Sequence, residues 1–452
     1  MKRSFNHMQF DCKRAAAAGL SLLTLLIGAG LPTFAGSEAK LHVPTNRVKK
    51  SPALTYDYTP DVLLIMPNAA ADNDEVAELL KEAHGTIVGS MGQGKMTCII
   101  YKTEKGHMLD TEQKFMKDKG HFNLISRNYK CKAQIVPNDP KFTSEWHLGA
   151  INAPTAWNTS TGQSTRIAIF DSGCQASNAD LNGKTQKGYN ATTFWAHLTT
   201  GAGSNPFGNL LGGIGGDLSS GAQTDVQGHG TFVATTAAAS FNNDFDTAGV
   251  SPGSTVYPIQ IANSSGQADD ISIMAGLLNA PDAGCRIINI SYNSAPPLGL
   301  SNASLHAPLH SYLKDFHDHH NGLVFMAAGN NGAFDANPIA PYINFVSAVD
   351  PTLGLTFFSN YGNSISFTAP GQSIVCSARD GSVQTVSGTS FSSPIVASIA
   401  ALVWNANPGL SNTQVENILK ASCSKAGSAN WTPYFGYGMP DAAQAVKFAT
   451  GG

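Results

Sequence analysis

Hydrophobic positions follow two different patterns on either side of about residue 133. In the first part, strands are predicted at residues 61–66, 86–90, 96–101 and 122–128. Helices are predicted at residues 72–83, where apolar side chains recur at i, i+3, i+4 and i+7, and at residues 108–119. The order β-α-β-β-α-β is that of a ferredoxin-like unit. No residue in it suggests chemistry, and a generic small domain fits the same pattern.

The second part alternates short apolar runs with helical stretches. Strands are predicted at residues 167–170, 256–261, 287–292 and 323–328, and helices at residues 229–240, 272–280 and 307–319. Because the runs are apolar without alternation, they predict an α/β fold with a parallel sheet covered by helices on both faces. Ligands of such folds bind at the carboxyl ends of the strands.

The apolar run at residues 395–404 has no helical period and predicts a helix that is buried on all sides. Ser390 lies at the start of this helix, beside free backbone N–H groups and the positive end of the helix dipole. Such a position favours the development of negative charge. Taken alone, a serine before a helix is more often a cap.

Three other polar residues lie just after predicted strands or at the start of a helix, which is where parallel α/β folds place their ligands. Asp171 directly follows the run at residues 166–170, Asn330 closely follows residues 323–328, and His229 opens a helix between two glycines. Asp, His and Ser therefore occur in that order along the chain. A serine hydroxyl needs a nearby base to become a nucleophile, and the base needs an orienting carboxylate. Each residue alone is equally well explained as a cap, a core histidine or a turn residue.

Four short motifs resemble the signature segments of subtilisin-like serine peptidases, the subtilases. They are Asp171-Ser172-Gly173, Gly228-His229-Gly230-Thr231, Ala327-Ala328-Gly329-Asn330 and Gly388-Thr389-Ser390. The resemblance covers residues 137–446 and is nearest to secreted, thermitase-like members. It implies that Ser390 is the nucleophile, His229 the general base and Asp171 the residue that orients it. It also implies that the Asn330 side chain and the Ser390 backbone N–H bind the oxyanion.

The resemblance extends to residues that bind substrate. Ser291, Tyr292 and Asn293 occupy the place of the family segment that borders the pocket for the P1 side chain. The family usually has glycine where this chain has Asn293, which leaves the P1 preference open. The segment that includes Ser264 and Gly266 resembles the strand that pairs with the substrate backbone.

A structural calcium site is also implied by the resemblance. Asp180 lies in a segment similar to the family's His-Pro-Asp-Leu, although the His-Pro pair is missing. The loop at residues 241–247 has the family's length and could offer carbonyl oxygens, which calcium prefers together with carboxylates and amides. The implied ligands are Asp139, Asp180, Phe241, Asn243, Phe245 and Thr247. Ordinary turn chemistry for Asp and Asn is the alternative.

Composition and the N-terminus add the cellular context. Basic residues precede an apolar run at residues 15–31, and a small-residue cleavage signal follows, so residues 1–35 are expected to be a signal peptide and the product to be secreted, either extracellular or periplasmic. An uncleaved membrane anchor is the alternative. Only 13% of residues are charged and the net charge is −3, which argues against nucleic acid as a partner. The seven cysteines show no metal-site spacing, and the sequence does not choose between free thiols and disulfides.

Two other features remain open at this stage. The Gly-rich stretch at residues 201–221 lengthens the spacing between Asp171 and His229 and is interpreted as a loop beside the cleft or a tolerated surface insertion. His306 and His310 are four residues apart on one predicted helix. A solvated helix surface explains them better than a transition-metal site.

The β-α-β-β-α-β unit resembles the inhibitory propeptide of the subtilases. This resemblance implies a self-processed zymogen with a signal peptide at residues 1–35, a linker and inhibitory propeptide at 36–133 and a catalytic domain at 134–452. The expected product is a monomeric serine endopeptidase that acts on proteins or peptides, needs no cofactor for catalysis and has no stable membrane association after signal removal. Its own propeptide is the expected inhibitor, although a permanent accessory domain fits the same order. A catalytically silent binding module and an esterase are the rival functions, and the lack of a Gly-x-Ser-x-Gly motif around Ser390 counts against the esterase.

Overall fold

The computed structural model describes residues 58–94, 97–129, 136–193, 221–424 and 430–451. The predicted signal peptide, the Gly-rich stretch up to residue 220 and residues 130–135 lie outside these ranges. None of the described helices combines the length and the apolar character that a membrane span requires.

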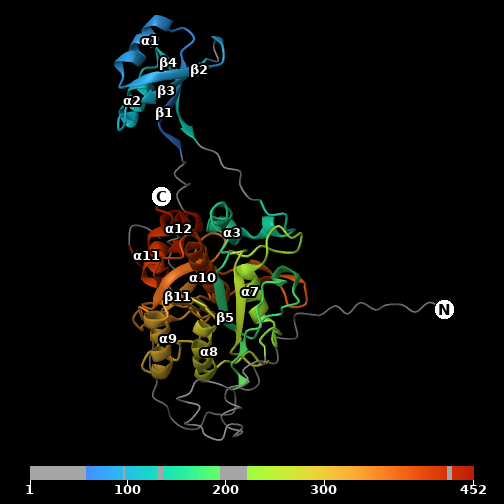
Figure 1. The fold of residues 1–452 in the computed structure, drawn as a ribbon. Coiled ribbons are helices and arrows are strands. Elements are labelled where there is room, and N and C mark those ends of the chain that lie inside the picture. Colours follow the sequence, from blue (N-terminus) through green and yellow to red (C-terminus); the bar gives the residue numbers. More distant parts are fainter. Residues whose placement is uncertain (1–57, 95–96, 130–135, 194–220, 425–429, 452) are drawn as a thin grey trace, which may run out of the picture. The chain divides into compact units, whose positions relative to one another are not determined.

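The N-terminal unit is a four-stranded antiparallel sheet with the strand order β2-β3-β1-β4 and two helices (Figure 1). Its strands are β1 (Tyr58–Pro67), β2 (Gly85–Met91), β3 (Cys98–Thr103) and β4 (Phe122–Tyr129). Its helices are α1 (Asn73–Glu82) and α2 (Met108–Lys117). Leu63, Ile65, Tyr101 and Phe115 form the centre of its core. The predicted β-α-β-β-α-β order is confirmed, because each predicted element overlaps an observed one.

The second body is built on a seven-stranded parallel sheet with the order β13-β11-β9-β8-β5-β7-β6. The strands are β5 (Arg166–Asp171), β6 (Tyr189–Asn190), β7 (Thr255–Gln260), β8 (Ile287–Ile290), β9 (Leu323–Ala327), β11 (Asn344–Val349) and β13 (Ile365–Pro370). β7 lies on one side of β5 and β8 on the other. The strand order therefore reverses at β5, and such a switch point creates a binding crevice at the carboxyl edge.

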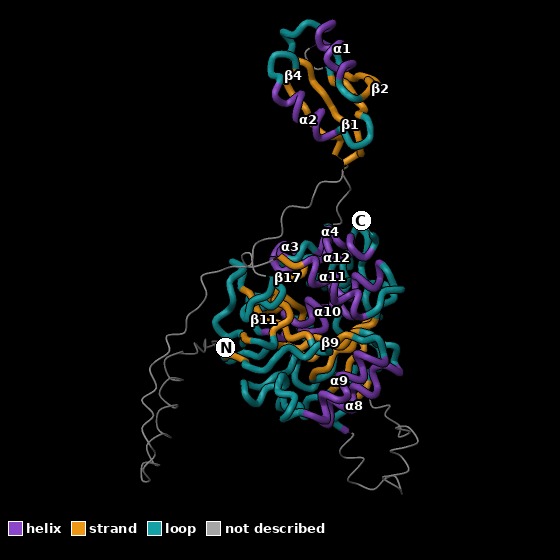
Figure 2. The backbone as a smooth tube through the Cα atoms, turned by 90° about the vertical axis from the view of Figure 1, so that its left-hand side faces the viewer, coloured by secondary structure: helices purple, strands orange, loops and turns teal. Residues whose placement is uncertain are grey.

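Helices cover both faces of this sheet, as the sequence predicted (Figures 1 and 2). α7 (His229–Ala238) and α10 (Thr389–Ala406) share a core with one face, which contributes Ile167 and Ile169. α8 (Asp270–Asp282) and α9 (Ala307–His319) pack on the other face, which contributes Ala168 and Phe170. Successive β5 residues thus enter opposite cores, which explains why the strand is apolar without alternation.

Shorter elements complete the second body. The helical ones are η2 (Phe142–Ser144), α3 (Trp146–Ala150), α4 (Ala153–Ala156), η3 (Ala179–Leu181), α11 (Asn412–Ser422) and α12 (Ala442–Ala449). The extended ones are β10 (Phe334–Asp335), β12 (Tyr361–Gly362), β14 (Ile374–Ser377), β15 (Val383–Val386), β16 (Cys423–Ser424) and β17 (Met439–Pro440).

Strands β11 and β13 were not expected from the sequence, although both are fully buried. Polar residues interrupt their apolar character, and two of them, Ser347 and Thr368, find partners inside the fold. Ser347 donates from Oγ to the Tyr434 carbonyl at 2.8 Å, and Thr368 donates from Oγ1 to the Ser347 carbonyl at 3.2 Å. Such tertiary hydrogen bonds make a buried hydroxyl tolerable, and local sequence does not reveal them.

The buried helix predicted after Ser390 is confirmed. α10 runs for 18 residues, and every residue from Thr389 to Trp404 is buried. Three cysteines of this body, Cys174, Cys285 and Cys376, are buried free thiols, and burial raises the pKa of Cys174 and Cys285 to about 12. These thiols therefore act as small core residues and not as reactive groups.

Candidate active site

The carboxyl edge of the sheet gathers the residues that the sequence singled out. Asp171 is the last residue of β5, Ser291 directly follows β8, and Asn330 lies three residues beyond the end of β9. Because β5, β8 and β9 are parallel neighbours, their carboxyl ends meet at one edge. The first residues of α7 and α10 bring His229 and Ser390 into this group, as the contacts below show.

Asp171 and His229 form a direct pair. His229 Nδ1 lies 2.9 Å from each carboxylate oxygen of Asp171, whose side chain is fully buried. A Cβ added to Gly230 would stand 1.9 Å from the Gly173 carbonyl oxygen and 3.1 Å from the Asp171 Cβ. The glycine after His229 is therefore what allows α7 to begin this close to the end of β5.

The pKa of His229 is the result of opposed effects. Burial favours the neutral ring and lowers the pKa, but the charge and hydrogen bond of Asp171 favour the imidazolium, and the net pKa lies above the ordinary value for histidine. The paired carboxylate also fixes the tautomer with the proton on Nδ1. Nε2 is then left as the basic nitrogen.

A second buried carboxylate, Asp225, supports the pair and was not anticipated from the sequence. Its Oδ2 accepts hydrogen bonds from the backbone N–H and Oγ1 of Thr231 at 2.7 and 2.6 Å, and its Oδ1 accepts from the Gly228 N–H at 2.6 Å. Ser172 donates from Oγ to Asp225 at 2.7 Å and accepts from the Gly230 N–H at 3.0 Å. The available signal was an aspartate four residues before a helix-opening histidine.

Ser390 lies at the first turn of α10 and is 6% exposed. Its Oγ donates to the Ser291 carbonyl at 3.1 Å, while Ser291 Oγ donates back to the Ser390 carbonyl at 2.8 Å. Among the described residues, no hydrogen bond joins Ser390 Oγ to His229. The next residue, Phe391, contacts the His229 ring with 5.9 Å between ring centroids. Apo active sites often show long or unformed catalytic hydrogen bonds, so this arrangement is compatible with proton transfer to Nε2.

Asn330 is oriented by the residue before Ser390. Its Oδ1 accepts hydrogen bonds from the backbone N–H and from Oγ1 of Thr389, both at 2.9 Å. Thr389 Oγ1 in turn accepts from the Gly329 N–H at 3.0 Å. Because the amide oxygen is held, Nδ2 remains available as a donor. Sequence reasoning did not foresee this positioning role of Thr389.

The expected substrate-binding residues lie beside this group. The Tyr292 ring packs edge-on against His229 with 5.8 Å between centroids. The Asn293 side chain is held by backbone groups: Nδ2 donates to the Ala327 and Ala328 carbonyls at 3.1 Å, and Oδ1 accepts from the Ser294 and Leu300 N–H groups at 2.8 Å. The side chain that replaces glycine therefore fixes the neighbouring loop.

The segment with Ser264 and Gly266 differs from the extended strand expected from the sequence. Asn263 Oδ1 accepts from the backbone N–H groups of Ser265 and Gln267 at 3.0 Å, and Gly266 has a positive φ of 73°. These local bonds close the segment into a tight turn. A Cβ on Gly266 would meet Gln227 at 3.8 Å, so the turn borders the loop before His229.

The residues expected to bind calcium are brought together away from the triad. Asp180 is fully buried, with Oδ2 accepting from the Thr247 N–H and Oγ1 at 3.0 and 2.9 Å and Oδ1 accepting from Asn243 Nδ2 at 3.3 Å. Asp139 Oδ2 accepts from the Asn242 N–H at 2.9 Å, but its buried Oδ1 has no hydrogen-bond partner among the described residues. A buried carboxylate oxygen without a partner is the feature that a bound cation would satisfy.

The electrostatics of the expected calcium site also favour a bound cation, because burial disfavours the charged form of its carboxyl groups. Burial raises the pKa of both Asp139 and Asp180, and it raises the pKa of nearby Glu145 to about 9. Asp139 and Asp180 add to the Glu145 shift through their negative charges. The loop at residues 241–247, which carries Phe241, Phe245 and Thr247, surrounds these carboxyl groups through the contacts given above. The donor set of carboxylates, an amide and carbonyls fits calcium.

His306 and His310 are engaged in protein contacts. His310 is buried, with Nδ1 2.9 Å from the Tyr342 hydroxyl and Nε2 2.8 Å from the Leu300 carbonyl. His306 Nδ1 lies 2.8 Å from Asp270 Oδ2. Both ring nitrogens of His310 are thus occupied, which favours a structural role. The expected solvated helix surface is therefore wrong for His310, which is buried.

A parallel α/β sheet with a buried Asp–His pair and a serine at a helix start is the arrangement of a serine hydrolase. The model of the subtilase family matches residues 162–438, and the chain belongs to this family. It is a subtilisin-like serine endopeptidase. The match spans most of the second body and leaves out the N-terminal unit.

Individual proteins that are similar to this chain are also subtilisin-like proteases. The chain is 30% identical over 318 residues to Subtilisin Savinase of Lederbergia lenta, a match that covers 70% of this chain and 100% of that protein. It is 28% identical over 316 residues to Thermitase of Thermoactinomyces vulgaris, covering 69% and 100%. A solved protease of Pseudoalteromonas arctica PAMC 21717 is 27% identical, with a TM-score of 0.56 over 70% of this chain and all of that one.

Proposed function

We propose that the chain is the precursor of a secreted endopeptidase that cleaves peptide bonds with an Asp171–His229–Ser390 triad. The observation that carries this proposal is the 2.9 Å contact between the buried Asp171 carboxylate and His229 Nδ1, at the edge where α10 presents Ser390. A carboxylate that orients a histidine beside a serine supplies the nucleophile, base and orienting group of acyl transfer.

In the proposed reaction, Ser390 Oγ attacks the carbonyl carbon of the substrate while its proton passes to His229 Nε2. Asp171 stabilises the imidazolium that forms. The Asn330 amide and the Ser390 backbone N–H donate to the oxyanion of the tetrahedral intermediate, where each preorganised donor contributes most because charge develops there. His229 then gives its proton to the departing amine, and water repeats the sequence on the acyl-enzyme.

A Ser390→Ala variant tests this assignment. We expect loss of nearly all activity on casein, by about 10⁶ in kcat, as occurs when a triad serine is removed from a related enzyme. Asn330→Ala is expected to reduce kcat by about 10²–10³. Substantial casein hydrolysis by purified Ser390→Ala protein contradicts the assignment, and a wild-type preference for short-chain esters over casein favours an esterase instead.

The N-terminal unit is proposed to be an inhibitory propeptide within residues 36–133 that follows a signal peptide at residues 1–35. Its helices and core cover one face of its sheet. Strand alternation places Leu64, Met66, Ile100 and Leu124 on the other face, and the Leu124 side chain is 57% exposed. An apolar sheet face of this kind suits a protein partner, and we take that partner to be the catalytic domain at residues 134–452.

Maturation is proposed to occur by self-cleavage within residues 128–136. Expression of the chain from residue 36 onward, with and without Ser390→Ala, tests the proposal by size and mass. We expect the variant to stay at full length while the wild type loses roughly its first hundred residues. Trimming of the purified variant at the same bond contradicts self-processing and leaves the triad untouched.

Calcium is proposed to bind at Asp139, Asp180 and Asn243 with carbonyl oxygens of Phe241, Phe245 and Thr247. When bound, it supplies positive charge to the buried carboxylates and cross-links the segments that carry them. Its role is structural.

A further inference from the structure

A pocket of about 230 Å³ lies at the amino ends of the strands, opposite the end of the sheet that holds the triad. It is bounded by the first residues of β5 and β8, by the end of α10 and by the turn that follows α10. The lining residues that bear on its chemistry are Arg166, Gly284, Arg286, Trp404 and Asn405. The pocket is lined by two arginines and by no aspartate or glutamate.

Among the described residues, the Arg166 side chain has no hydrogen-bond or ion-pair partner. Its Nε is shielded from solvent and makes no hydrogen bond with any described residue, and no ion pair involves this side chain in the described ranges. The neighbouring residue Gly284 has a positive φ of 73°, and a Cβ there would lie 3.4 Å from Arg166 Nη1. A buried N–H that has lost water without gaining an acceptor is costly, so Arg166 Nε is a donor that a ligand could satisfy.

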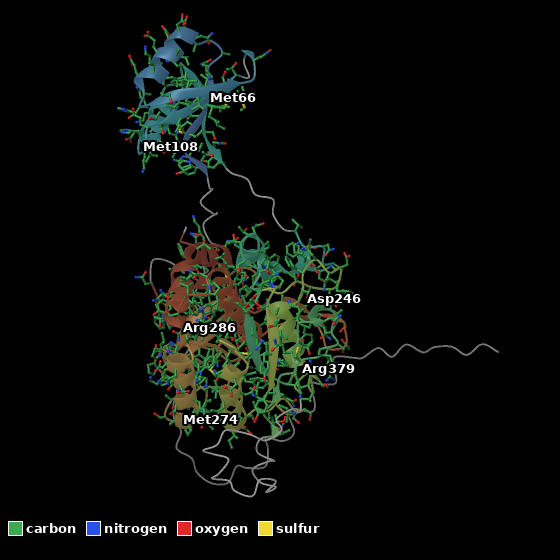
Figure 3. All side chains as sticks on the ribbon, viewed as in Figure 1. Met66, Met108, Asp246, Met274, Arg286 and Arg379 are labelled. Atoms are coloured by element: carbon green, nitrogen blue, oxygen red, sulfur yellow. The ribbon has the colours of Figure 1, made fainter. Side chains whose placement is uncertain are left out.

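Arg286, which is labelled in Figure 3, lines the same pocket, and its guanidinium is held by several contacts. It stacks 4.3 Å from the centroid of the Trp404 ring and donates from Nη2 to the Leu410 carbonyl at 2.8 Å and from Nη1 to the Pro408 carbonyl at 3.3 Å. All of these partners are neutral, so its positive charge is not balanced by them. Burial lowers the pKa of Arg286, as expected for a cation without a carboxylate partner.

Asn405 adds an uncharged donor to the two cations. Its Oδ1 accepts from Ser160 Oγ at 2.8 Å and from the Gly162 N–H at 3.1 Å. These bonds hold the amide oxygen against the protein, which leaves Nδ2 as a donor, and Asn405 is one of the residues that line the pocket.

We propose that this pocket binds a small divalent oxyanion of the sulfate or phosphate type, held by Arg166, Arg286 and Asn405 Nδ2. Two guanidinium groups match a double negative charge, and planar N–H forks suit tetrahedral oxyanions. The volume lies below the roughly 300–1,000 Å³ of pockets for drug-sized ligands, which favours a small ion.

An anion in this pocket would join three elements at one end, and the opposite ends of the same elements hold the proposed catalytic residues. β5 carries Asp171, β8 leads to Ser291, and α10 starts beside Ser390. An anion that bridges Arg166 on β5, Arg286 before β8 and Asn405 on α10 adds its binding free energy to the folded state. The expected consequence is greater thermal stability of the second body, with no part in the chemical step.

The test measures the melting temperature of the Ser390→Ala protein, which cannot digest itself, as sodium sulfate replaces sodium chloride at constant ionic strength. We expect a saturable rise in the millimolar range and calorimetric binding of one sulfate, with phosphate acting similarly. Acetate is expected to be at least tenfold weaker, and comparable saturable binding of acetate would reassign the site to carboxylates and overturn the divalent preference.

Two variants and one control decide whether the pocket is responsible. Arg166→Gln removes the unpartnered cation, and Asn405→Asp keeps both accepted hydrogen bonds but adds a negative charge. Both are expected to lose the saturable rise and the calorimetric signal, whereas Lys447→Gln, which removes an exposed cation on α12, should retain them. A rise that is linear in sulfate and equal in all four proteins is general salt stabilisation and overturns the proposal.

Discussion

At the scale of single residues, buried polar groups orient two side chains, those of His229 and Asn330. Asp171, Ser172 and Asp225 are all buried and linked by hydrogen bonds that end at the start of α7. Thr389 does the same for Asn330. Each donor or acceptor in these groups constrains its neighbour, and such preorganisation is what a reaction with developing charge requires.

Asp171→Asn is expected to reduce kcat by about 10⁴ with little change in KM, because an amide neither fixes the Nδ1–H tautomer nor stabilises the imidazolium. Steady-state kinetics on a peptide substrate measure the effect. Asp282→Asn, an exposed carboxylate at the end of α8, is the matched control and should behave as wild type. Retention of more than a tenth of wild-type kcat by Asp171→Asn would contradict the proposed role of the pair.

The pH profile of the wild-type enzyme should follow His229. The ring must be neutral to accept the Ser390 proton, so kcat/KM should rise with pH as the ring loses its proton. Because the Asp171 carboxylate raises the pKa of His229 above the ordinary value of about 6.5, the midpoint is expected above that pH. In the residual activity of Asp171→Asn the midpoint should move to lower pH, and a midpoint that stays in place would assign this limb to another group.

His147 offers a stability test in the same body. The ring is fully buried, neither nitrogen has a hydrogen-bond partner among the described residues, and burial lowers its pKa to about 3. Between about pH 6.5 and 3 the unfolded chain binds a proton that the folded protein excludes. Stability is therefore lost as pH falls, by up to about 1.4 kcal/mol per pH unit.

In the Ser390→Ala background, His147→Leu should raise the melting temperature, and the gain should be larger at pH 5 than at pH 8. His319→Leu removes an exposed histidine at the end of α9 and should show a much smaller pH-dependent gain. A His147→Leu effect that is equal at both pH values would mean that the ring is not excluded from protonation.

At the scale of elements, the site depends on how closely α7 and α10 approach the ends of the strands. The α7 approach rests on a glycine, because the Gly173 carbonyl lies where a Cβ of residue 230 would be. α10 approaches through its buried first turn, where Ser390 and Ser291 exchange hydrogen bonds. The packing of these helices against the strands sets the distances, and neither segment sets them alone.

Gly230→Ala should reduce kcat/KM by about 10²-fold and lower the melting temperature, because α7 must shift away from Asp171 to make room for the methyl group. Gly149→Ala is the matched control: its Cβ would meet nothing within 4 Å, and its position in α3 favours alanine. Near-wild-type activity in Gly230→Ala would show that the start of α7 can move without loss of the catalytic pair.

At the scale of the whole molecule, charged side chains gather at two sites that share no hydrogen bond with the triad residues in the described part of the chain. One gathers buried carboxylates from segments near residues 139, 145 and 180, and the other gathers two arginines at the opposite edge of the sheet. Each site joins segments far apart in the chain. Ions at these sites would therefore stabilise the tertiary structure as cross-links do.

Calcium should raise the melting temperature of the Ser390→Ala protein relative to EDTA, by an amount that corresponds to about 2.7 kcal/mol when free calcium is 100 times Kd. Asp139→Asn should remove most of the difference, because it deletes charge at the carboxylate with the unpartnered oxygen. Asp282→Asn should leave it intact. Equal melting temperatures in EDTA and in millimolar calcium would exclude a stabilising calcium site.

The sequence by itself indicated four of the seven strands of the parallel sheet, the α/β class and the candidate catalytic residues. Apolar runs without alternation indicate strands buried on both faces, and short motifs such as Gly228-His229-Gly230 carry the local geometry that their chemistry needs. Helix α9 was predicted with the observed bounds, because its apolar positions recur at helical spacing. The roles of Asp171, His229, Ser390 and Asn330 remain proposals that the observed contacts support.

Tertiary structure decided what depends on contacts between distant segments. β11 and β13 have polar residues that only tertiary hydrogen bonds make tolerable, and the supporting role of Asp225 depends on Ser172, which lies 53 residues away in the chain. The Asn263 side chain accepts a hydrogen bond from the Ser265 N–H and closes a turn where an extended strand was expected. The pocket between Arg166 and Arg286 follows from strand order, since only the pairing of β5 with β8 brings these residues together.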